Sequence, residues 1–312
     1  MDTTGQFDVS VVLAVYNERG HVRQEIERIR ASLEASSYTF EIIVVDDGSN
    51  DGSADELGQI QDIRLIRFTR NRGTGAARKA GTRAARGRAV AWTDADMTYP
   101  NQEIPRLVKE LDGYDQVVGA RTSEQGRIKA LRVPAKWFIR KLASYLIQQP
   151  IPDLNSGLRV FRRDVALQYL HMLPEGFSCV STLSLAFLAN GYSIGYVPIE
   201  YRQRAGRSKF HWWTDTKRYV TQVVRMILSW NPLRVFIPVG VVLSLIAITK
   251  LGYDWATKDF HVAANTLLVF FAAFQIFAIG LLADLVVRVT KPRDEVEPSA
   301  QFTRDSAEPR PD

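Results

Sequence analysis

The clearest chemical signal in the sequence is the tripeptide Asp94-Ala95-Asp96. It closes an apolar stretch, Ala89–Thr93, of the kind that forms a buried strand. Carboxylates two positions apart can bind one hard cation when the chain turns between them. A divalent ion held by one or two carboxylates together with substrate phosphates is the usual magnesium arrangement. The spacing therefore predicts a site for Mg2+ or Mn2+ at Asp94 and Asp96, next to a diphosphate.

Polar residues and glycines also follow three other apolar stretches in the N-terminal half. They read YNE at 16–18, DDGS at 46–49 and NRGTG at 71–75. Any one of them alone is as typical of a turn or a helix cap as of a site. Ligands on parallel sheets lie at the carboxyl ends of strands, so the four groups in this order predict one ligand site along a single edge.

The glycine-rich group opens a predicted helix that contains Arg78 and Lys79. Backbone amides at such a place can point at an anion, and glycine permits a close approach. A dinucleotide-binding loop is the competing interpretation. That fingerprint follows the first strand, whereas this loop follows the third, so the position argues against it.

The elements that must position these residues alternate between two patterns. Strands are predicted at Val9–Tyr16, Phe40–Asp47, Ile63–Phe68, Ala89–Asp96 and Asp115–Arg121, and helices at His21–Ser36, Ser53–Gln61, Thr74–Arg86 and Asn101–Leu111. Strands that alternate with helices of this length indicate βαβ units. The predicted fold class is therefore α/β, with a mainly parallel sheet.

Positive charge is concentrated in a few places. The chain has 40 Lys and Arg against 34 Asp and Glu, a net charge of +6, and basic residues gather at 70–88, 121–141 and 201–234. Localised charge beside apolar segments indicates bound phosphates and an anionic lipid surface, and argues against nucleic acid as a partner. The single cysteine, Cys179, excludes an internal disulfide.

Two long apolar segments, Leu233–Leu251 and Asn265–Val287, follow the last basic stretch. Each is long enough to cross a hydrocarbon core of about 30 Å. Basic residues flank the pair on both long sides, so the positive-inside rule predicts two spans in the inner membrane, with the N-terminal domain and the C-terminus in the cytoplasm. A buried hairpin in a soluble core is the alternative, although the second segment shows no polar face.

The chain thus divides into four predicted parts. A catalytic α/β domain occupies residues 1–210, a juxtamembrane amphipathic region 211–232, a two-helix transmembrane domain 233–289 and a disordered tail 290–312. The juxtamembrane helix, Asp215–Trp230, carries apolar residues beside basic ones, which fits a helix on an anionic membrane surface. A packed connector helix would show the same pattern.

Six segments together resemble the GT-A glycosyltransferases of family 2, and more narrowly the polyprenyl-phosphate glycosyltransferases of the dolichyl-phosphate-mannose synthase type. They are AVYNE at 14–18, VVDDGSNDGS at 44–53, NRGTGAARKAG at 71–81, DADMTYP at 94–100, DLNSGLRVFRRD at 153–164 and RAGRSKF at 204–210. The resemblance covers roughly residues 9–289. It implies a Rossmann-like GT-A domain followed by amphipathic interface helices and two transmembrane helices.

The resemblance also implies a role for each matching position. The donor nucleotide would be bound by Ala14, Tyr16, Asn17, Glu18, Asp46, Asp47, Gly75, Asp94 and Ala95, and the metal by Asp94 and Asp96. The acceptor phosphate would be bound by Arg121, Lys136 and Arg140, of which the last two differ from the Arg and Ser of the family. A basic loop with Arg204, Ser208 and Lys209 would close over the donor diphosphate.

These roles imply an inverting, metal-dependent transfer of a hexose from a UDP- or GDP-sugar to undecaprenyl or dolichyl phosphate. A phosphate monoester has a second pKa of about 6, so the acceptor is largely a dianion at pH 7 and needs positioning more than a general base. Asp153, before Asn155-Ser156-Gly157, either acts as a base or orients acceptor-site groups. A loop aspartate in an Asx turn is an equal alternative.

Two other hypotheses compete with this one. The first is a membrane-anchored family 2 glycosyltransferase that extends a glycan on a lipid-linked or other hydroxyl acceptor, which would need a carboxylate base. The second is a non-catalytic membrane scaffold, against which the intact aspartates argue. The predicted partners are the nucleotide sugar, the polyprenyl phosphate and the anionic bilayer. A homo-oligomer is compatible with the sequence. The sequence identifies neither the sugar nor the nucleotide base of the donor.

Overall fold

The computed structural model describes residues 6–122, 152–176, 178–201, 228, 232–257 and 262–290. The described residues up to 201 form one compact unit, and those from 228 onward form a second. Outside the described residues lie five predicted site residues, Lys136, Arg140, Arg204, Ser208 and Lys209. The tail from 291 onward and nearly all of the predicted juxtamembrane region lie outside them as well.

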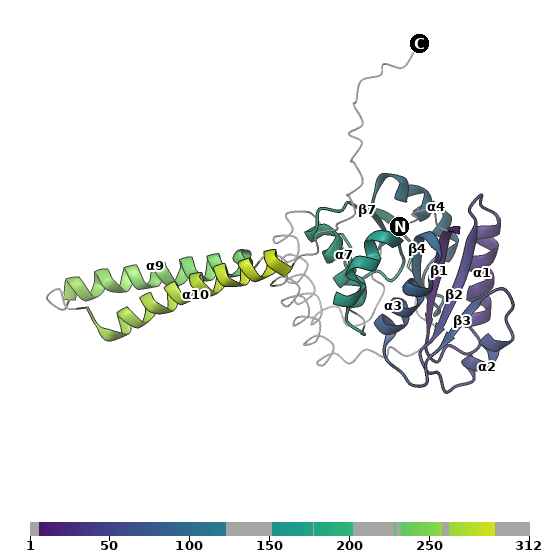
Figure 1. Cartoon of the computed structure of the whole chain (residues 1–312), viewed down its shortest axis with the longest axis horizontal. Coiled ribbons are helices and arrows are strands. Elements are labelled where there is room, and N and C mark those ends of the chain that lie inside the picture. The colour runs from purple at the N-terminus through teal and green to yellow at the C-terminus, as the bar shows by residue number, and fades with distance from the viewer. Residues whose placement is uncertain are drawn as a thin grey trace, which may run out of the picture. The chain divides into compact units, whose positions relative to one another are not determined.

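The first unit is built on a seven-stranded sheet with the order β3-β2-β1-β4-β6-β5-β7 (Figure 1). The strands are β1 (Phe7–Val15), β2 (Phe40–Asp46), β3 (Arg64–Arg67), β4 (Gly87–Asp94), β5 (Gln116–Arg121), β6 (Arg159–Arg162) and β7 (Ile194–Ile199). Neighbouring strands pair in parallel, except that β6 runs antiparallel to both β4 and β5. The predicted α/β class with a mainly parallel sheet is confirmed.

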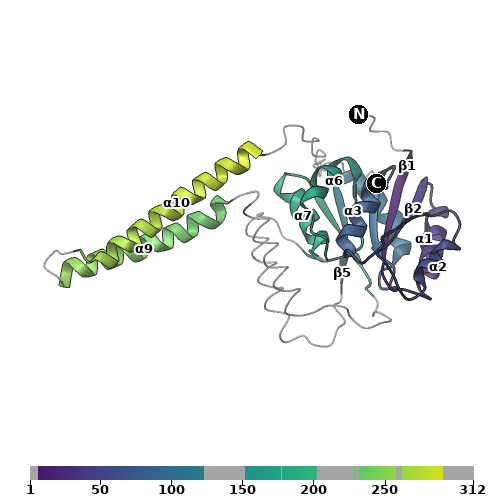
Figure 2. The same ribbon diagram turned by 60° about the horizontal axis from the view of Figure 1, so that its bottom comes forward.

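Helices cover both faces of the sheet. They are α1 (Val22–Glu34), α2 (Ser53–Gly58), α3 (Thr74–Ala84), α4 (Ile104–Glu110), α6 (Arg163–Tyr169) and α7 (Cys179–Ala189). The α1 helix and the α4 helix pack on one face, and α3, α6 and α7 lie on the other (Figure 2). The carboxyl ends of β1, β2 and β4 lie at one common edge between the two helical layers.

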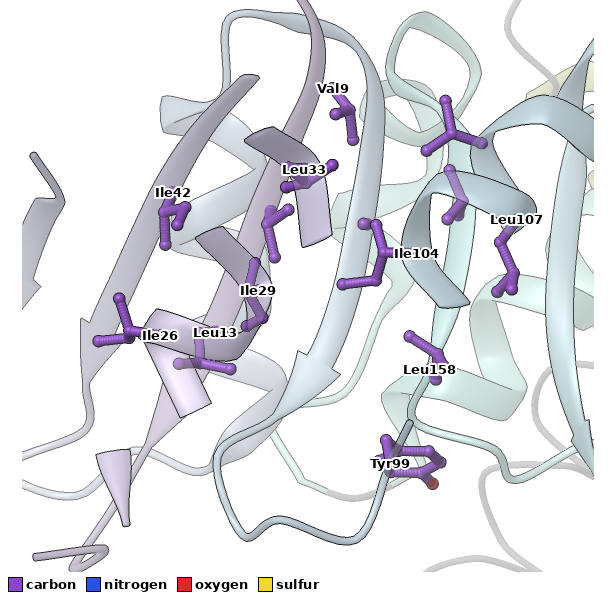
Figure 3. Packing of buried hydrophobic residues seen from close by; sticks show 14 of the residues in the cluster. Val9, Leu13, Ile26, Ile29, Leu33, Ile42, Tyr99, Ile104, Leu107 and Leu158 are labelled. Atoms are coloured by element: carbon purple, nitrogen blue, oxygen red, sulfur yellow. The ribbon is translucent and has the colours of Figure 1, made fainter. Parts of the chain in front are cut away.

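The alternation of side chains in β1 explains the two layers. Val9 and Leu13 belong to the core under α1 and α4 (Figure 3), whereas Val12 points to the opposite face and touches α3 at Gly81. The α1 helix supplies its share of this core from residues at helical spacing, among them Ile26 and Ile29. A strand buried on both faces is the rule for parallel sheets.

Two strands and two helices, β6, β7, α6 and α7, were not predicted from the sequence. The antiparallel direction of β6 matters most. A parallel strand brings the residues that follow it to the carboxyl edge, but an antiparallel one brings the residues that precede it. The segment 153–158 therefore reaches the same edge as the residues after β4 and β5.

The second unit is a hairpin of two long helices, α9 (Leu233–Thr257) and α10 (Ala264–Thr290). Both are long and apolar enough to cross a membrane, and only 11% and 17% of their most apolar windows are buried within the protein. The helices pack where Phe277 lies against Gly240 and Phe236 lies against Gly280. Low burial distinguishes them from core helices of a soluble domain, as expected for membrane spans.

Candidate active site

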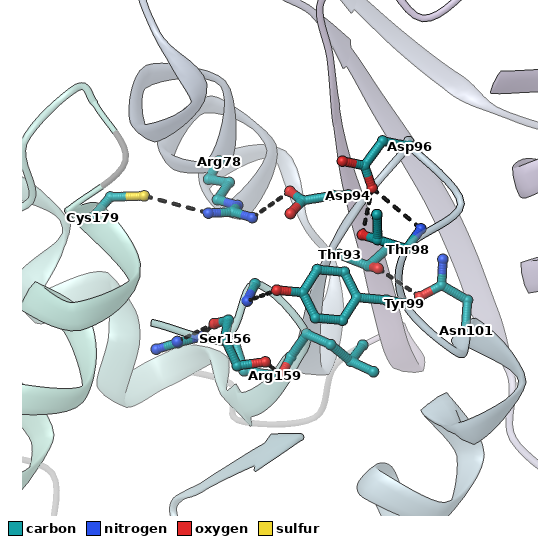
Figure 4. A network of polar contacts seen from close by, with 12 residues as sticks. Arg78, Thr93, Asp94, Asp96, Thr98, Tyr99, Asn101, Ser156, Arg159 and Cys179 are labelled. Atoms are coloured by element: carbon teal, nitrogen blue, oxygen red, sulfur yellow. Dashed lines mark hydrogen bonds and ion pairs between the residues drawn. The ribbon is translucent and has the colours of Figure 1, made fainter. Parts of the chain in front are cut away.

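The first feature of the site is an ion pair at the end of β4 (Figure 4). Nη2 of Arg78 on α3 lies 2.6 Å from Oδ1 of Asp94, and the arginine side chain is 3% exposed against 34% for the aspartate. Nη1 of Arg78 lies 3.6 Å from Sγ of Cys179, and its guanidinium lies over the Trp92 ring, 5.5 Å from the centroid. A buried cation thus stands directly behind one of the predicted metal ligands.

The second predicted ligand, Asp96, is held by a tight turn. Met97 has a φ of 62°, and this left-handed residue reverses the chain directly after Asp96. The Thr98 hydroxyl donates a hydrogen bond to Oδ1 of Asp96 at 2.5 Å, and the Thr98 amide donates to the same atom at 3.3 Å. Thr98 therefore orients the Asp96 carboxylate.

This arrangement fits a divalent cation that completes its coordination with substrate. Asp94 engages Arg78 through Oδ1 and remains one-third exposed, and Asp96 lies two residues away across the turn. Within the part of the chain that the structure describes, no group of three or more His, Cys, Asp or Glu could hold a metal. Two carboxylates could hold a divalent cation together with phosphate oxygens, so the metal site at Asp94 and Asp96 stays a prediction.

A chain of buried hydrogen bonds supports the turn 94–99, which carries the two predicted metal ligands and is called the metal turn. Thr93 donates a hydrogen bond to Oδ1 of Asn101 at 2.5 Å, and the Asn101 amide donates to the carboxylate of Glu25 on α1. Burial raises the pKa of Glu25, and the nearby Arg28, at 2.9 Å, offsets part of that rise. Sequence reasoning missed Glu25, because a carboxylate on an amphipathic helix normally faces solvent.

The predicted donor residues are brought together by strand register and by backbone hydrogen bonds. Ala14 is the β1 partner of Asp94 in β4. The Asn17 amide donates to Oγ of Ser49 at 3.0 Å, and the Glu18 amide donates to Oγ of Ser53 at 3.0 Å. The segments after β1 and β2 are therefore joined, and both lie at the edge that carries the aspartates.

Asp46 and Asp47, at the end of β2, accept hydrogen bonds from nearby backbone amides. Oδ1 of Asp46 accepts a hydrogen bond from the Ser49 amide at 3.0 Å. The two oxygens of Asp47 accept from the amides of Arg72 and Gly73, at 2.7 and 2.8 Å. Burial raises the pKa of Asp47, and the hydrogen bonds from these amides oppose that rise. Asp47 thus anchors the glycine-rich loop to the sheet.

The glycine-rich loop differs from the expectation that its amides face an anion. The Gly75 amide donates to the backbone carbonyl of Glu175 at 2.7 Å, and a Cβ at position 75 would lie 2.2 Å from the carbonyl oxygen of Pro174. Nζ of Lys79 donates to the carbonyl of Leu173 at 3.0 Å. The glycine is required for the close approach of the segment 173–175, a contact that no spacing in the sequence reveals.

On the acceptor side, Arg121 at the end of β5 forms a two-pronged ion pair with Asp153. Nε of Arg121 lies 2.7 Å from Oδ2 and Nη2 lies 3.0 Å from Oδ1 of Asp153. Burial tends to raise the pKa of Asp153, but the hydrogen bonds and the charge of Arg121 outweigh it and the pKa is lowered. A carboxylate held in this way orients its partner and is a weak proton acceptor.

The loop that carries Asp153 also touches the metal turn. The Gly157 amide donates a hydrogen bond to the hydroxyl of Tyr99 at 2.7 Å (Figure 4). A Cβ at position 157 would lie 2.7 Å from Oδ2 of Asp94. Glycine is needed here because the backbone passes directly over the carboxylate. The predicted donor and acceptor sides of the edge are therefore in contact.

Beneath the segment 153–158 lies a buried arginine that was not predicted from the sequence. Arg159 in β6 is fully buried and donates hydrogen bonds to the carbonyls of Ser156 and Val180 and, at 2.8 Å, to Oγ of Ser184. Burial lowers the pKa of Arg159 to about 10, and the neighbouring charge of Arg78 adds to this effect. Arg159 ties the segment before β6 to the first turns of α7.

Comparison with known proteins extends over both units. The family model "Glycosyl transferase family 2" matches residues 10–170, and the model "GtrB C-terminal hairpin" matches residues 231–289. The chain is 30% identical over 311 residues to an undecaprenyl-phosphate 4-deoxy-4-formamido-L-arabinose transferase of Aeromonas hydrophila, covering 90% of this chain and 89% of that protein. A protein of the same description from Enterobacter is 30% identical, covering 90% and 88%.

Solved structures confirm the fold. Glucosyl-3-phosphoglycerate synthase from Mycobacterium tuberculosis in complex with UDP superposes with a TM-score of 0.57 at 20% identity, covering 71% of this chain and 80% of that one. The complex of that enzyme with Mn2+, UDP and glucosyl-3-phosphoglycerate gives the same values. The sheet is thus of the expected GT-A type. With a family match over more than half of its length and relatives that cover both units, the chain belongs to glycosyltransferase family 2.

Proposed function

We propose that this glycosyltransferase transfers a sugar from a nucleoside diphosphate sugar to a polyprenyl phosphate at the cytoplasmic face of the inner membrane. The observation that carries the proposal is the extent of the match to the undecaprenyl-phosphate transferases. It covers 90% of the chain and so takes in the apolar hairpin as well as the α/β domain. An enzyme whose acceptor is a lipid phosphate needs both a sugar-transfer site and a membrane anchor.

The donor side of the site supports a divalent cation between the enzyme and the diphosphate. Asp94 and Asp96 would hold Mg2+ or Mn2+, and the cation would stabilise the charge that builds on the leaving diphosphate. Arg78 keeps the Asp94 carboxylate in place from the protein side. The predicted Lys209 and Arg204 would add positive charge from the basic loop, which lies outside the described residues.

In the proposed reaction an oxygen of the acceptor phosphate attacks the anomeric carbon of the donor sugar. The bond from that carbon to the diphosphate oxygen breaks, and the nucleoside diphosphate leaves with the electron pair. One displacement of this kind inverts the anomeric configuration. Because the acceptor is already a dianion at neutral pH, no general base is required.

The role left open for Asp153 is best filled by orientation. Its ion pair with Arg121 lowers the pKa of the carboxyl and fixes the plane of the guanidinium. Arg121, together with Lys136 and Arg140, would then neutralise the acceptor phosphate. Asp153 acts in this proposal on the arginine and not on the substrate.

The test is a transfer assay with the full chain in detergent or in nanodiscs with Mn2+ or Mg2+. A panel of labelled UDP- and GDP-sugars is offered to undecaprenyl phosphate, to dolichyl phosphate and, as the matched control, to undecaprenol, which lacks the phosphate. We expect a metal-dependent product with the phosphates and none with the alcohol. Transfer to hydroxyl acceptors alone would instead establish the glycan-extending alternative.

A further inference from the structure

Tyr201 lies two residues after β7, at the point where the described part of the first unit ends. Its half-buried side chain packs against the main hydrophobic core. Neither the motifs of the sequence nor the proposed reaction assigns this residue a role. Its contacts, however, reach both halves of the site.

The first contact is with the metal turn. The Tyr201 ring stands edge-on to the Tyr99 ring, with centroids 5.1 Å apart and an interplanar angle of 67°. Burial raises the pKa of the Tyr201 phenol, and the Tyr201 hydroxyl is hydrogen-bonded to the Thr98 side chain. The Thr98 hydroxyl in turn donates to Asp96 at 2.5 Å. The Tyr201 phenol is therefore linked to the predicted metal ligand Asp96 through a single side chain, that of Thr98.

The second contact is with the acceptor arginine. The guanidinium of Arg121 lies over the face of the Tyr201 ring, 5.3 Å from the centroid. The edge of the same guanidinium is taken by the carboxylate of Asp153, at 2.7 and 3.0 Å. A planar cation held by a carboxylate at its edge and an aromatic ring at its face has one orientation available.

We propose that Tyr201 is a positioning residue that couples the metal turn to the acceptor arginine: its hydroxyl side braces Thr98 and Asp96, and its ring face orients Arg121. This inference rests on the proposed function, because it gives Arg121 an acceptor phosphate to bind. The coupling sets the distance between the donor diphosphate and the acceptor phosphate, on which a direct displacement depends.

A ring that merely filled space would not need these features. A leucine fills a similar volume in a core, but it offers neither a hydroxyl to Thr98 nor a π face to Arg121. The two functions of the tyrosine are separable by substitution, so each half of the coupling can be tested alone.

The experiment compares Tyr201→Phe and Tyr201→Leu with the native enzyme. Tyr201→Phe keeps the ring and loses the hydroxyl, so we expect the Mn2+ concentration at half-maximal rate to rise about threefold while KM for undecaprenyl phosphate stays within twofold. Tyr201→Leu also loses the π face, and KM for undecaprenyl phosphate should rise about tenfold, an effect between that of an exposed and that of a desolvated cation–π contact. Calorimetry of UDP binding with Mn2+ gives an activity-independent reading of the metal half.

The matched control is Tyr192→Leu, which removes a tyrosine ring from the buried cluster with Phe187 and Tyr169. It should lower Tm and leave both constants unchanged. If the Tyr201 variants likewise lower Tm only, with KM and the Mn2+ dependence native, Tyr201 is a packing residue and the inference is wrong. If the native enzyme itself does not glycosylate undecaprenyl phosphate, the proposed function fails instead, and calorimetry still decides whether Tyr201 supports metal-dependent UDP binding.

Discussion

The guanidinium of Arg78 and the carboxylate of Asp94 meet at 2.6 Å, with the arginine buried and the aspartate partly open to solvent. The arginine offsets one of the two negative charges of the Asp94 and Asp96 pair. A site with reduced negative charge has a reduced affinity for a cation alone, and favours one that arrives with the phosphates of the donor. We therefore expect the ion pair to link metal binding to substrate binding.

Arg78→Met tests this relationship. The substitution removes the partner of Asp94 and should destabilise the protein by roughly 2 kcal/mol, less than for a fully buried pair because Asp94 is partly hydrated. A divalent cation should then restore stability, so the rise in Tm on adding Mn2+ should be larger in the variant than in the native protein. Thermal unfolding with and without Mn2+ measures both effects.

The control for that measurement is Arg106→Met on α4. Arg106 pairs with Glu103 at 3.0 Å, but both side chains are substantially exposed, at 54% and 33%. Its loss should change stability by less than about 0.5 kcal/mol and leave the response to Mn2+ unaltered. An equal response to Mn2+ in Arg78→Met and in the native chain would contradict the proposed link.

Asp96→Asn should remove most of the metal-dependent activity. The amide keeps the size of the side chain and can still hydrogen-bond to Thr98, but it loses the charge that a hard cation requires. We expect turnover at saturating Mn2+ to fall by about a hundredfold or more. Asp112→Asn, at an exposed position in the turn before β5, is the matched control and should retain native activity. Native turnover in Asp96→Asn would refute the metal assignment.

Asp153→Asn distinguishes orientation from base catalysis. If Asp153 orients Arg121, KM for the acceptor should rise about tenfold while the pH dependence of kcat keeps its shape. A lost general base would instead lower kcat by about a hundredfold or more and change that pH dependence. Steady-state kinetics between pH 6 and about 9 separate the two outcomes.

The stability difference between the native protein and Asp153→Asn depends on pH. The pKa of Asp153 is lowered in the folded protein from its ordinary value of 3.8, so the ionised carboxylate stabilises the fold above that pH. This contribution is lost as the pH falls through the folded-state pKa. The stability difference between the native protein and Asp153→Asn should be full at neutral pH and should shrink below about pH 3.8, as denaturation midpoints would show.

Gly157→Ala should disturb the metal side from the acceptor loop. The added Cβ would lie 2.7 Å from Oδ2 of Asp94 and 3.1 Å from Nη2 of Arg78, so either the loop or the ion pair must move. We expect a several-fold loss of Mn2+ affinity together with a lower Tm. Gly113→Ala, where no atom lies within 4 Å of the new Cβ, should be silent in both measurements. A native Mn2+ titration in Gly157→Ala would show that the contact is not functional.

The part of the fold that carries the predicted donor residues, from β1 to β4, was predictable because its sequence signals are local. The apolar runs that become β1, β2 and β4 each end in polar residues, and the parallel arrangement follows from the helices between them. The position of Asp94 and Asp96 at the end of β4 was predictable for the same reason. Their orientation by Arg78 and Thr98 was not, since it depends on contacts with α3 and on a left-handed residue at Met97.

The acceptor half was harder to predict. The β6 strand is four residues long and carries Arg159, which is fully buried, so alternation of polar and apolar residues does not mark it as a strand. The α7 helix is buried on nearly all sides, with small hydroxyl residues among its apolar ones, so its sequence shows no amphipathic period. The contact of the Glu175 carbonyl with the Gly75 amide also escaped prediction, because a backbone acceptor carries no side-chain signature.

The ion pair between Arg121 and Asp153 has a consequence for the residues between them. Arg121 is the last residue of β5, and Asp153 follows the stretch 123–151, which lies outside the described residues. One contact therefore holds the chain on both sides of that stretch at the end of β5. We expect that substitutions within 123–151 can change the predicted acceptor contacts of Lys136 and Arg140 while Arg121 keeps its place.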